Sequence, residues 1–220
     1  MPPCDDSDEA MPPCEDSDDD SDEFPTETEL DERAIRKFPS LVGYDEVTAQ
    51  IVPPGDKEIP QWEESAIQKR VNFDKAYGKL IPCPRTMEVL AVELKRGLEG
   101  QLLQCGEHST WVATKLAEMA EMKLQIIDTV NVPDVSISNK GCLFITCPCF
   151  YGKVAAAMIN YHLRMGDAWT HIVYGNDGDG VAHAHELENT LKENYVELEM
   201  VRETVNWYDE YGFVAIFKLK

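Results

Sequence analysis

The sequence from Pro84 to Lys220 alternates short apolar segments with amphipathic segments, and this alternation restricts the fold more than any other feature of the chain. In the amphipathic segments, such as RTMEVLAVELKRGL, apolar residues recur every three to four positions, which predicts helices. The apolar segments, such as GCLFIT and WTHIVYG, have the length of buried strands. Strands that alternate with helices form a mostly parallel sheet covered on both faces. We therefore expect an α/β fold.

The pattern places each expected element by residue range. We expect helices at 85–98, 108–122, 151–167 and 182–195, and strands at 100–106, 123–132, 141–147, 169–175, 195–207 and 212–220. No helix separates the last two strands, so they are expected to pair as antiparallel neighbours, joined by the polar turn DEYG.

The charge of the chain is concentrated at its beginning. Asp and Glu number 41 against 20 Lys and Arg, a formal net charge of -21, and residues 1–32 contain no Lys or Arg. These residues include the tandem repeat MPPCDDSDEA–MPPCEDSDDD, whose self-repulsion and lack of apolar periodicity predict disorder. We expect an acidic disordered tail at 1–32, a lead-in segment at 33–74 and one α/β domain at 75–220.

Composition also excludes several classes of protein. Without a block of basic residues, we expect no direct binding to duplex nucleic acid. No apolar run has the roughly 18–20 residues that a membrane span requires, so no membrane association is expected. The acidic start does not resemble a secretory signal, and the chain has seven cysteines, an odd number. Reduced thiols in the cytoplasm or nucleus are therefore expected.

Several segments resemble the class I, or seven-β-strand, methyltransferases, and in particular their protein-lysine methyltransferase branch. AYGKLIPCPRTMEVLAVEL resembles the segment that precedes the first strand of that family, and GQLLQCGEHSTWVATKLAE resembles its first strand, glycine loop and helix. LQIIDTV and LFITCPCFYGKVAAAMINYHL resemble its second and fourth strands, and the residues from LKENY to the end resemble its closing hairpin. The resemblance implies a Rossmann-like three-layer sandwich, with a mostly parallel sheet that ends in an antiparallel hairpin.

The resemblance also implies a transferase that uses S-adenosyl-L-methionine and methylates lysine on a protein substrate. By position, it assigns Gln104, Gly106 and Asp128 to the cofactor, and Asp128 would accept hydrogen bonds from the ribose hydroxyls. It assigns Cys149, Phe150 and Tyr151 to the border of the acceptor pocket. No catalytic residue is identified, because methyl transfer needs positioning more than acid–base chemistry.

Two departures from the family keep other functions open. The loop after the first strand has one glycine, Gly106, followed by Glu107 and His108, where the family has several glycines. About fifteen residues separate Asp128 from LFIT, too few for the helix, strand and helix of a complete methyltransferase core. One alternative is a catalytically inactive methyltransferase-like module that binds a protein partner.

The second alternative is a flavodoxin-like redox domain that binds FMN. In that interpretation GEHST would be the phosphate loop, at the start of a helix, and CPCFYG and YGNDGDG would border the flavin. Cys147, Cys149, His183 and His185 have ligand types that zinc accepts, but their spacing does not suit one site, and we expect no metal.

Overall fold

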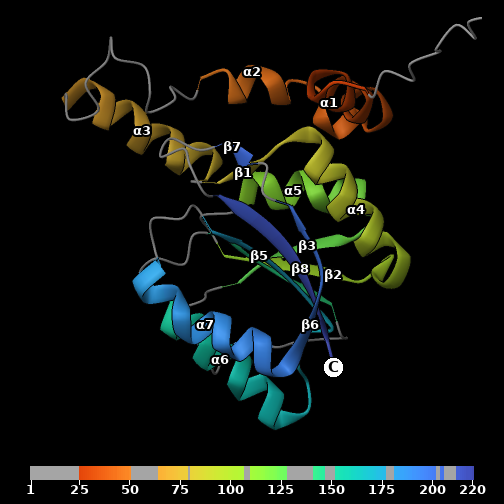
Figure 1. The fold of residues 1–220 in the computed structure, drawn as a ribbon, viewed down its shortest axis with the longest axis vertical. Coiled ribbons are helices and arrows are strands. Elements are labelled where there is room, and N and C mark those ends of the chain that lie inside the picture. The colour runs from red at the N-terminus through yellow and green to blue at the C-terminus, as the bar shows by residue number, and fades with distance from the viewer. Residues whose placement is uncertain are drawn as a thin grey trace, which may run out of the picture.

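The computed structural model describes residues 25–50, 64–78, 80–106, 110–127, 141–146, 152–176, 181–201, 204–205 and 212–220 (Figure 1). Its helices are α1 (Glu27–Lys37), the 3₁₀ helix η1 (Pro39–Leu41), α2 (Tyr44–Thr48), α3 (Glu64–Tyr77), α4 (Pro84–Leu98), α5 (Thr110–Met119), α6 (Gly152–Met165) and α7 (Val181–Asn194). Its strands are β1 (Ile81–Pro82), β2 (Leu102–Cys105), β3 (Lys123–Ile126), β4 (Cys142–Thr146), β5 (His171–Asn176), β6 (Tyr195–Val201), β7 (Thr204–Val205) and β8 (Phe213–Leu219).

Six strands form the central sheet in the order β3-β2-β4-β5-β8-β6. The pairs β3–β2, β2–β4 and β4–β5 are parallel, and β8 is antiparallel to both β5 and β6. The antiparallel pairing of the last two long strands is therefore confirmed. So is the Rossmann-like α/β class, because a parallel sheet ends here in one inserted antiparallel strand.

The expected strand at 195–207 is wrong in one respect, because its end leaves the central sheet. β6 stops at Val201, and β7 pairs instead with β1 of the chain before α4, with Ile81 opposite Val205 and Pro82 opposite Thr204. Alternation along one segment reports that both parts are extended, but it carries no information about the strand to which each one bonds. Of the expected turn DEYG at 209–212, residues 209–211 lie outside the described residues, whereas Gly212 is described and buried.

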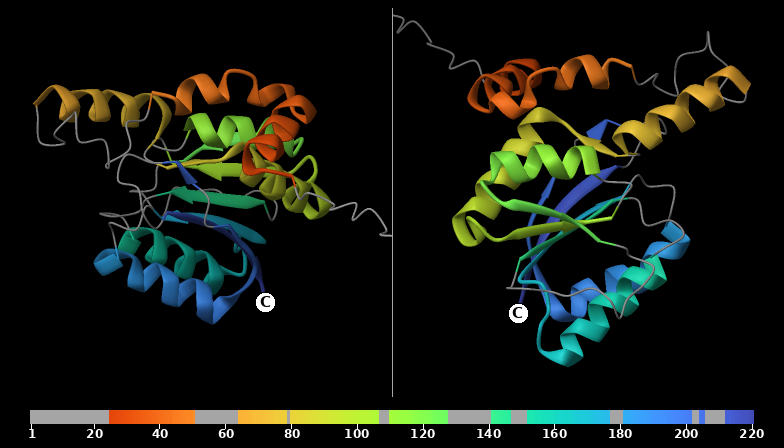
Figure 2. Two further views of the ribbon diagram at one scale, coloured as in Figure 1. Left: turned by 45° about the horizontal axis from the view of Figure 1, so that its top comes forward. Right: turned by 180° about the vertical axis from the view of Figure 1, so that it is seen from behind.

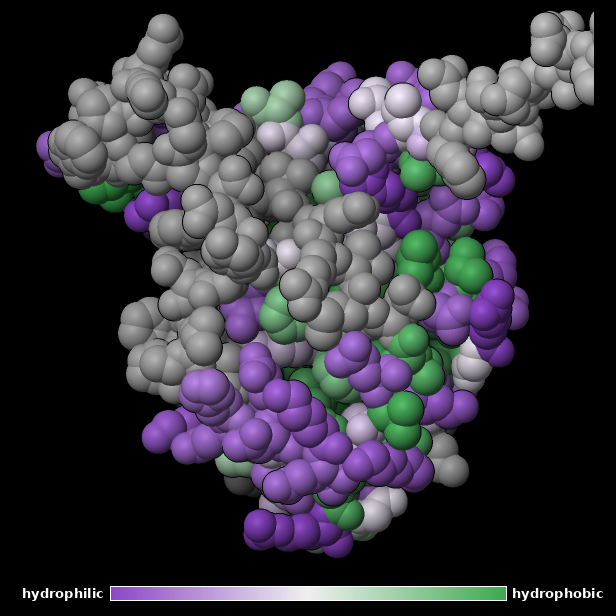
Figure 3. All heavy atoms as spheres, viewed as in Figure 1, coloured by the Kyte–Doolittle hydropathy of each residue, from purple (hydrophilic) through white to green (hydrophobic). Residues whose placement is uncertain are grey.

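Helices cover the sheet on both faces, as Figures 1 and 2 show. α4 and α5 lie on one face, and their inward side chains pack with Leu103, Phe144 and Val173 of the strands. α6 and α7 lie on the other face and pack with Leu143 and Ile172. Figure 3 shows that the outer surface of α7 is mostly hydrophilic, as expected for a helix that buries only one side. No described helix is long and apolar enough to cross a membrane.

The lead-in helices form a further layer over α4 and α5 (Figure 2). α1 starts with a capping box between Thr26 and Glu29, and its Asp31 carboxylate accepts a hydrogen bond of 3.0 Å from the backbone N–H of Arg85. This contact supplies an acceptor at the start of α4, whose own N-cap residue makes no side-chain capping bond. α1 begins at Glu27, so its first turns lie within the range 1–32 that the sequence assigns to the tail.

Candidate functional site

The carboxyl ends of the parallel strands meet at one edge of the sheet, which we call the carboxyl edge. Its described residues include Cys105 and Gly106 after β2, Ile127 after β3, Thr146 at the end of β4 and Gly175 in β5. Cys105 lies opposite Ile126, the Ile127 N–H donates to the Cys105 carbonyl at 2.9 Å, and Thr146 lies opposite Gly175. In open α/β sheets, ligands bind beyond this edge.

Two helices start close to the carboxyl edge. α5 begins at Thr110, five residues after the end of β2, and α6 begins at Gly152, six residues after the end of β4. The backbone N–H groups at the start of a helix attract anionic and polar ligand groups. The described frame of the edge is therefore suited to a ligand that carries a carboxylate, a phosphate or hydroxyl groups.

Gln104, one of the residues assigned to the cofactor, lies inside the sheet rather than at its edge. Its side chain is buried, and both ends of its amide are bonded within the protein. The Trp169 indole N–H donates to Oε1 at 2.5 Å, and Nε2 donates to Gln125 Oε1 at 2.6 Å. Gly106, two residues further on, is half-buried at the edge itself. The structure therefore brings only Gly106 of this pair to the place where a ligand would bind.

The remaining site residues assigned from the sequence lie outside the described residues. These are Asp128, which directly follows Ile127, and the three acceptor-pocket residues Cys149, Phe150 and Tyr151. The loop residues Glu107 and His108 also lie outside them. Their roles stay predictions.

The two buried cysteines among the described residues, Cys105 and Cys142, do not supply a nucleophile at this edge. Cys105 is buried beside it, and burial raises the pKa of its thiol to about 11. Burial also raises the pKa of the Cys142 thiol at the start of β4. Both thiols are free and remain protonated at neutral pH, whereas the reactive form of cysteine is the thiolate.

The chain before α4 forms one wall of the carboxyl edge. Leu80 is buried against Gly175, where a Cβ atom would lie 2.5 Å from its Cδ2 atom and 3.3 Å from Cγ2 of Thr146. The next residues form β1, and the Tyr44 hydroxyl donates to the Pro82 carbonyl at 2.5 Å. The glycine in β5 therefore makes room for the lead-in to cross the ends of β4 and β5.

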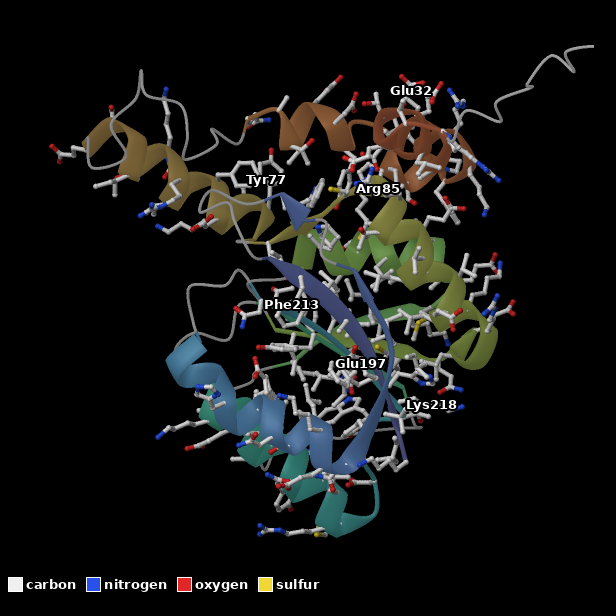
Figure 4. The ribbon with its side chains drawn as sticks, in the orientation of Figure 1. Glu32, Tyr77, Arg85, Glu197, Phe213 and Lys218 are labelled. Atoms are coloured by element: carbon white, nitrogen blue, oxygen red, sulfur yellow. The ribbon has the colours of Figure 1, made fainter. Side chains whose placement is uncertain are left out.

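Aromatic side chains join the lead-in to the start of α5. Trp111, the second residue of α5, lies with its ring centroid 5.0 Å from that of Tyr44 and 5.3 Å from that of Tyr77, and Tyr77 lies 4.9 Å from Phe73. Figure 4 shows Tyr77 at the end of α3 that reaches the body of the protein. Sequence reasoning missed this cluster, because its members come from three separate segments. The sequence offered no clear signal for it, because aromatic residues are about as frequent before α4 as in the whole chain.

Polar groups also gather at the end of β5. Asn176 is buried, its Nδ2 donates to the Tyr174 hydroxyl at 3.0 Å, and that hydroxyl lies 3.5 Å from Oε1 of Glu188. Phe213 of β8 (labelled in Figure 4) lies opposite Asn176, and its ring meets the Tyr174 ring edge-on. Within the described ranges, no three His, Cys, Asp or Glu residues are placed to hold a metal ion.

A groove of about 560 Å³ lies elsewhere, between the end of α1, η1, α4 and the end of α5. Its residues include Phe38, Ala91 and Met119, with Lys37 and Lys95 at its margins. Met119 is the last residue of α5, whereas the carboxyl edge adjoins the first, so the two places are about 15 Å apart along the helix. The groove is therefore separate from the candidate ligand edge.

No family model matches the sequence, and a search of curated proteins finds no match. Among solved structures, the N-methyltransferase NodS from Bradyrhizobium japonicum WM9 in complex with S-adenosyl-L-homocysteine is 11% identical, with a TM-score of 0.40, over 80% of this chain and 98% of that chain. An rRNA methylase from Streptococcus thermophilus is 9% identical, with a TM-score of 0.38, over 63% of this chain and 96% of that chain. Values this low do not assign a function.

Proposed function

We propose that this chain is a methyltransferase-like protein that binds an S-adenosyl ligand at the carboxyl edge of β2, β3 and β4 and methylates lysine on a protein. The observation that carries the proposal is the position of β8, which runs antiparallel between β5 and β6. This is the ending implied by the resemblance to class I methyltransferases. The flavodoxin-like alternative requires a fifth parallel strand in that place, so the topology favours the S-adenosyl ligand over FMN.

The described donors at the edge fit such a ligand in part. Gly106 has no side chain that would keep a ligand from the backbone, and the start of α5 suits the carboxylate of the methionyl part. Asp128, the residue after Ile127, would accept the ribose hydroxyls. Gln104 would not contact the ligand through its amide, because both amide ends are already bonded.

The bound ligand would supply an electrophilic methyl group on a sulfonium. In the transfer, the lone pair of a neutral lysine amine would form the new N–C bond as the C–S bond breaks, the C–S electron pair would stay on sulfur as a neutral thioether, and the amine would then lose a proton to solvent. The protein's part is to align the amine and exclude water. Cys149, Phe150 and Tyr151 would border the incoming lysine.

One calorimetric comparison tests the ligand. Purified full-length protein is titrated with S-adenosylmethionine, S-adenosylhomocysteine and FMN. Binding of the adenosyl ligands alone supports the proposal, whereas binding of FMN alone, or of none of the three, contradicts it. Asp128→Ala should weaken adenosyl-ligand binding by about ten- to a hundredfold, because a charged acceptor of two hydrogen bonds is lost. Asp134→Ala is the matched control and should leave binding unchanged.

An inactive module remains the second candidate, and a specific feature favours it. The loop GEHST places Glu107 and His108 where the family has glycines, so a bound ligand would meet two side chains. Incubation with isotopically labelled S-adenosylmethionine and lysine-containing proteins, followed by mass spectrometry, separates the two candidates. Methyl-lysine supports the enzyme, whereas the absence of both methyl transfer and adenosyl-ligand binding supports a module that has lost its cofactor.

A further inference from the structure

Hydrogen bonds link three strands and the loop before β5 on the α6–α7 face of the sheet. The Tyr195 hydroxyl at the start of β6 donates to the Trp169 carbonyl at 3.2 Å. The Trp169 indole donates to Gln104 of β2, and Gln104 donates to Gln125 of β3. Trp169, Tyr195 and Gln104 are all buried, whereas Gln125 is exposed on the edge strand β3. The hydrogen bonds of these side chains therefore connect β6, one edge strand of the sheet, with β3, the other edge strand.

The direction of these bonds is determined by chemistry. An indole N–H can only donate, so the Gln104 atom that faces Trp169 must be the amide oxygen. The Gln104 amide nitrogen then faces β3 and donates, so Gln125 must present its oxygen. A side chain at position 125 that lacks an acceptor would leave the Gln104 N–H group unpaired in a buried position.

The register of β3 is held by fewer strand contacts than the register of an inner strand. β3 has four residues, and among the described strands it pairs only with β2. A shift of one residue would turn Gln125 to the other face and break the bond to Gln104. In the observed register, Gln125 lies opposite Gln104, and two residues later the Ile127 N–H donates to Cys105, next to Gly106.

We propose that Gln104 and Gln125 are positioning residues, which hold the carboxyl end of β3 against that of β2 so that the ligand edge is correctly formed. This inference rests on the proposed function, since Asp128 directly follows Ile127. It assigns Gln104 a role through β3 instead of direct contact with the cofactor. Trp169 determines the orientation of the Gln104 amide and therefore contributes to the same positioning.

The test compares two variants at the exposed position 125. Gln125→Leu removes the acceptor, whereas Gln125→Glu keeps a carboxylate oxygen that can accept from Gln104. Amide hydrogen exchange is measured at Ile127, and at Leu219, whose N–H bonds to the Thr170 carbonyl far from β3. We expect exchange at Ile127 to become about tenfold faster in Gln125→Leu and to stay near the wild-type rate in Gln125→Glu. Exchange at Leu219 should not change in either variant.

Titration with S-adenosylhomocysteine gives the second readout. Gln125→Leu should bind it about three- to tenfold more weakly than wild type, and Gln125→Glu should bind it normally. Unchanged exchange at Ile127, equal acceleration at Leu219, or equal behaviour of the two variants would overturn the positioning role, and so would normal ligand binding by Gln125→Leu. If wild type binds no adenosyl ligand, the proposed function fails, and the exchange rates alone decide whether Gln125 positions β3.

Discussion

The α4–α5 face of the sheet is packed mainly by apolar side chains, whereas the α6–α7 face contains buried polar side chains that bond to their neighbours. On the α4–α5 face, the apolar cluster extends from the strands through the helices to Leu41 and Tyr44 of the lead-in. On the other face, the buried polar residues are Gln104, His162, Asn176 and Thr190. Their partners are, respectively, Trp169, Asp167, Tyr174 and Asn160.

The two faces therefore hold their strands by different interactions. Apolar packing is non-directional and depends on the volume filled. Buried hydrogen bonds are directional, and each partner that loses its bond incurs a desolvation cost. Substitutions that remove volume should therefore cost most on the α4–α5 face, and substitutions that remove a donor should cost most on the α6–α7 face.

The largest effect should come from a cavity on the apolar face. Leu90 of α4 is 0% exposed, and Leu90→Ala should lower the free energy of unfolding by about 2–5 kcal/mol through lost burial and an unfilled cavity. Denaturant melts measure this change. Val89→Ala is the control, because Val89 is 37% exposed on the same helix, and it should cost well under half as much. Equal losses would show that this face is not tightly packed.

Removing one donor tests the polar face. Trp169→Phe keeps most of the buried aromatic volume but removes the N–H that bonds to Gln104, so it should cost about 1–3 kcal/mol by leaving a buried oxygen unpaired. The double variant Gln104→Leu/Trp169→Phe should be more stable than the sum of the single changes predicts. Additive losses in chemical denaturation would mean that the bond is energetically unimportant and that the two faces are alike.

Overfilling the contact between the lead-in and β5 should have an intermediate to small effect. A methyl group at Gly175 would meet Leu80, whose terminal atom can move, so Gly175→Ala should cost about 1–2 kcal/mol. Leu80→Ala in the same chain should relieve the clash, and the thermal melt of the double variant should show this coupling. If Gly175→Ala were neutral alone, Leu80 would not be held firmly at the carboxyl edge.

The smallest effect should be a pH dependence on the apolar face. Burial, helped by nearby Lys218, lowers the pKa of His171 below its usual 6.5, while Glu93 acts in the opposite direction. The unfolded chain thus binds a proton at a higher pH than the folded chain does. The stability that His171 contributes is fully present above about pH 6.5 and is lost as the pH falls from there to the folded pKa. Unfolding measured between pH 5 and 8 should show a steeper loss for wild type than for His171→Gln.

The two edge strands of the sheet, β3 and β6, also differ from each other. At one edge Ile126 of β3 is 53% exposed, and at the other Val196 and Leu198 of β6 are exposed, where Figure 3 shows hydrophobic surface over β6. β6 carries the exposed Glu197 and a register shift between Glu197 and Glu199, two features that oppose further strand pairing. β3 also has an exposed charged side chain, Lys123, but it has no register shift, and Gln125 bonds to Gln104 of the neighbouring strand.

Much of the fold could be predicted from the sequence, because helix and strand periods are local properties. The pattern in RTMEVLAVELKRGL and YGKVAAAMINYHLRMGD predicted α4 and α6 to within one or two residues at each end. The absence of a helix between β6 and β8 predicted their antiparallel pairing. These features depend on residues that are neighbours in the chain, so the sequence alone carries them.

The rest of the architecture could not be predicted, because it depends on contacts between residues far apart in the chain. Gln104 has a position near the expected cofactor loop, yet its partners, Gln125 and Trp169, are 21 and 65 residues away. The contact of Leu80 with Gly175 and the pairing of β7 with β1 also join segments that are far apart in the chain. Local sequence patterns thus predicted which segments from Pro84 onward are helical or extended, and where the acidic residues are concentrated. The packing of distant segments decided which polar groups are left for a ligand, because a hydrogen bond made inside the protein is no longer available at the site.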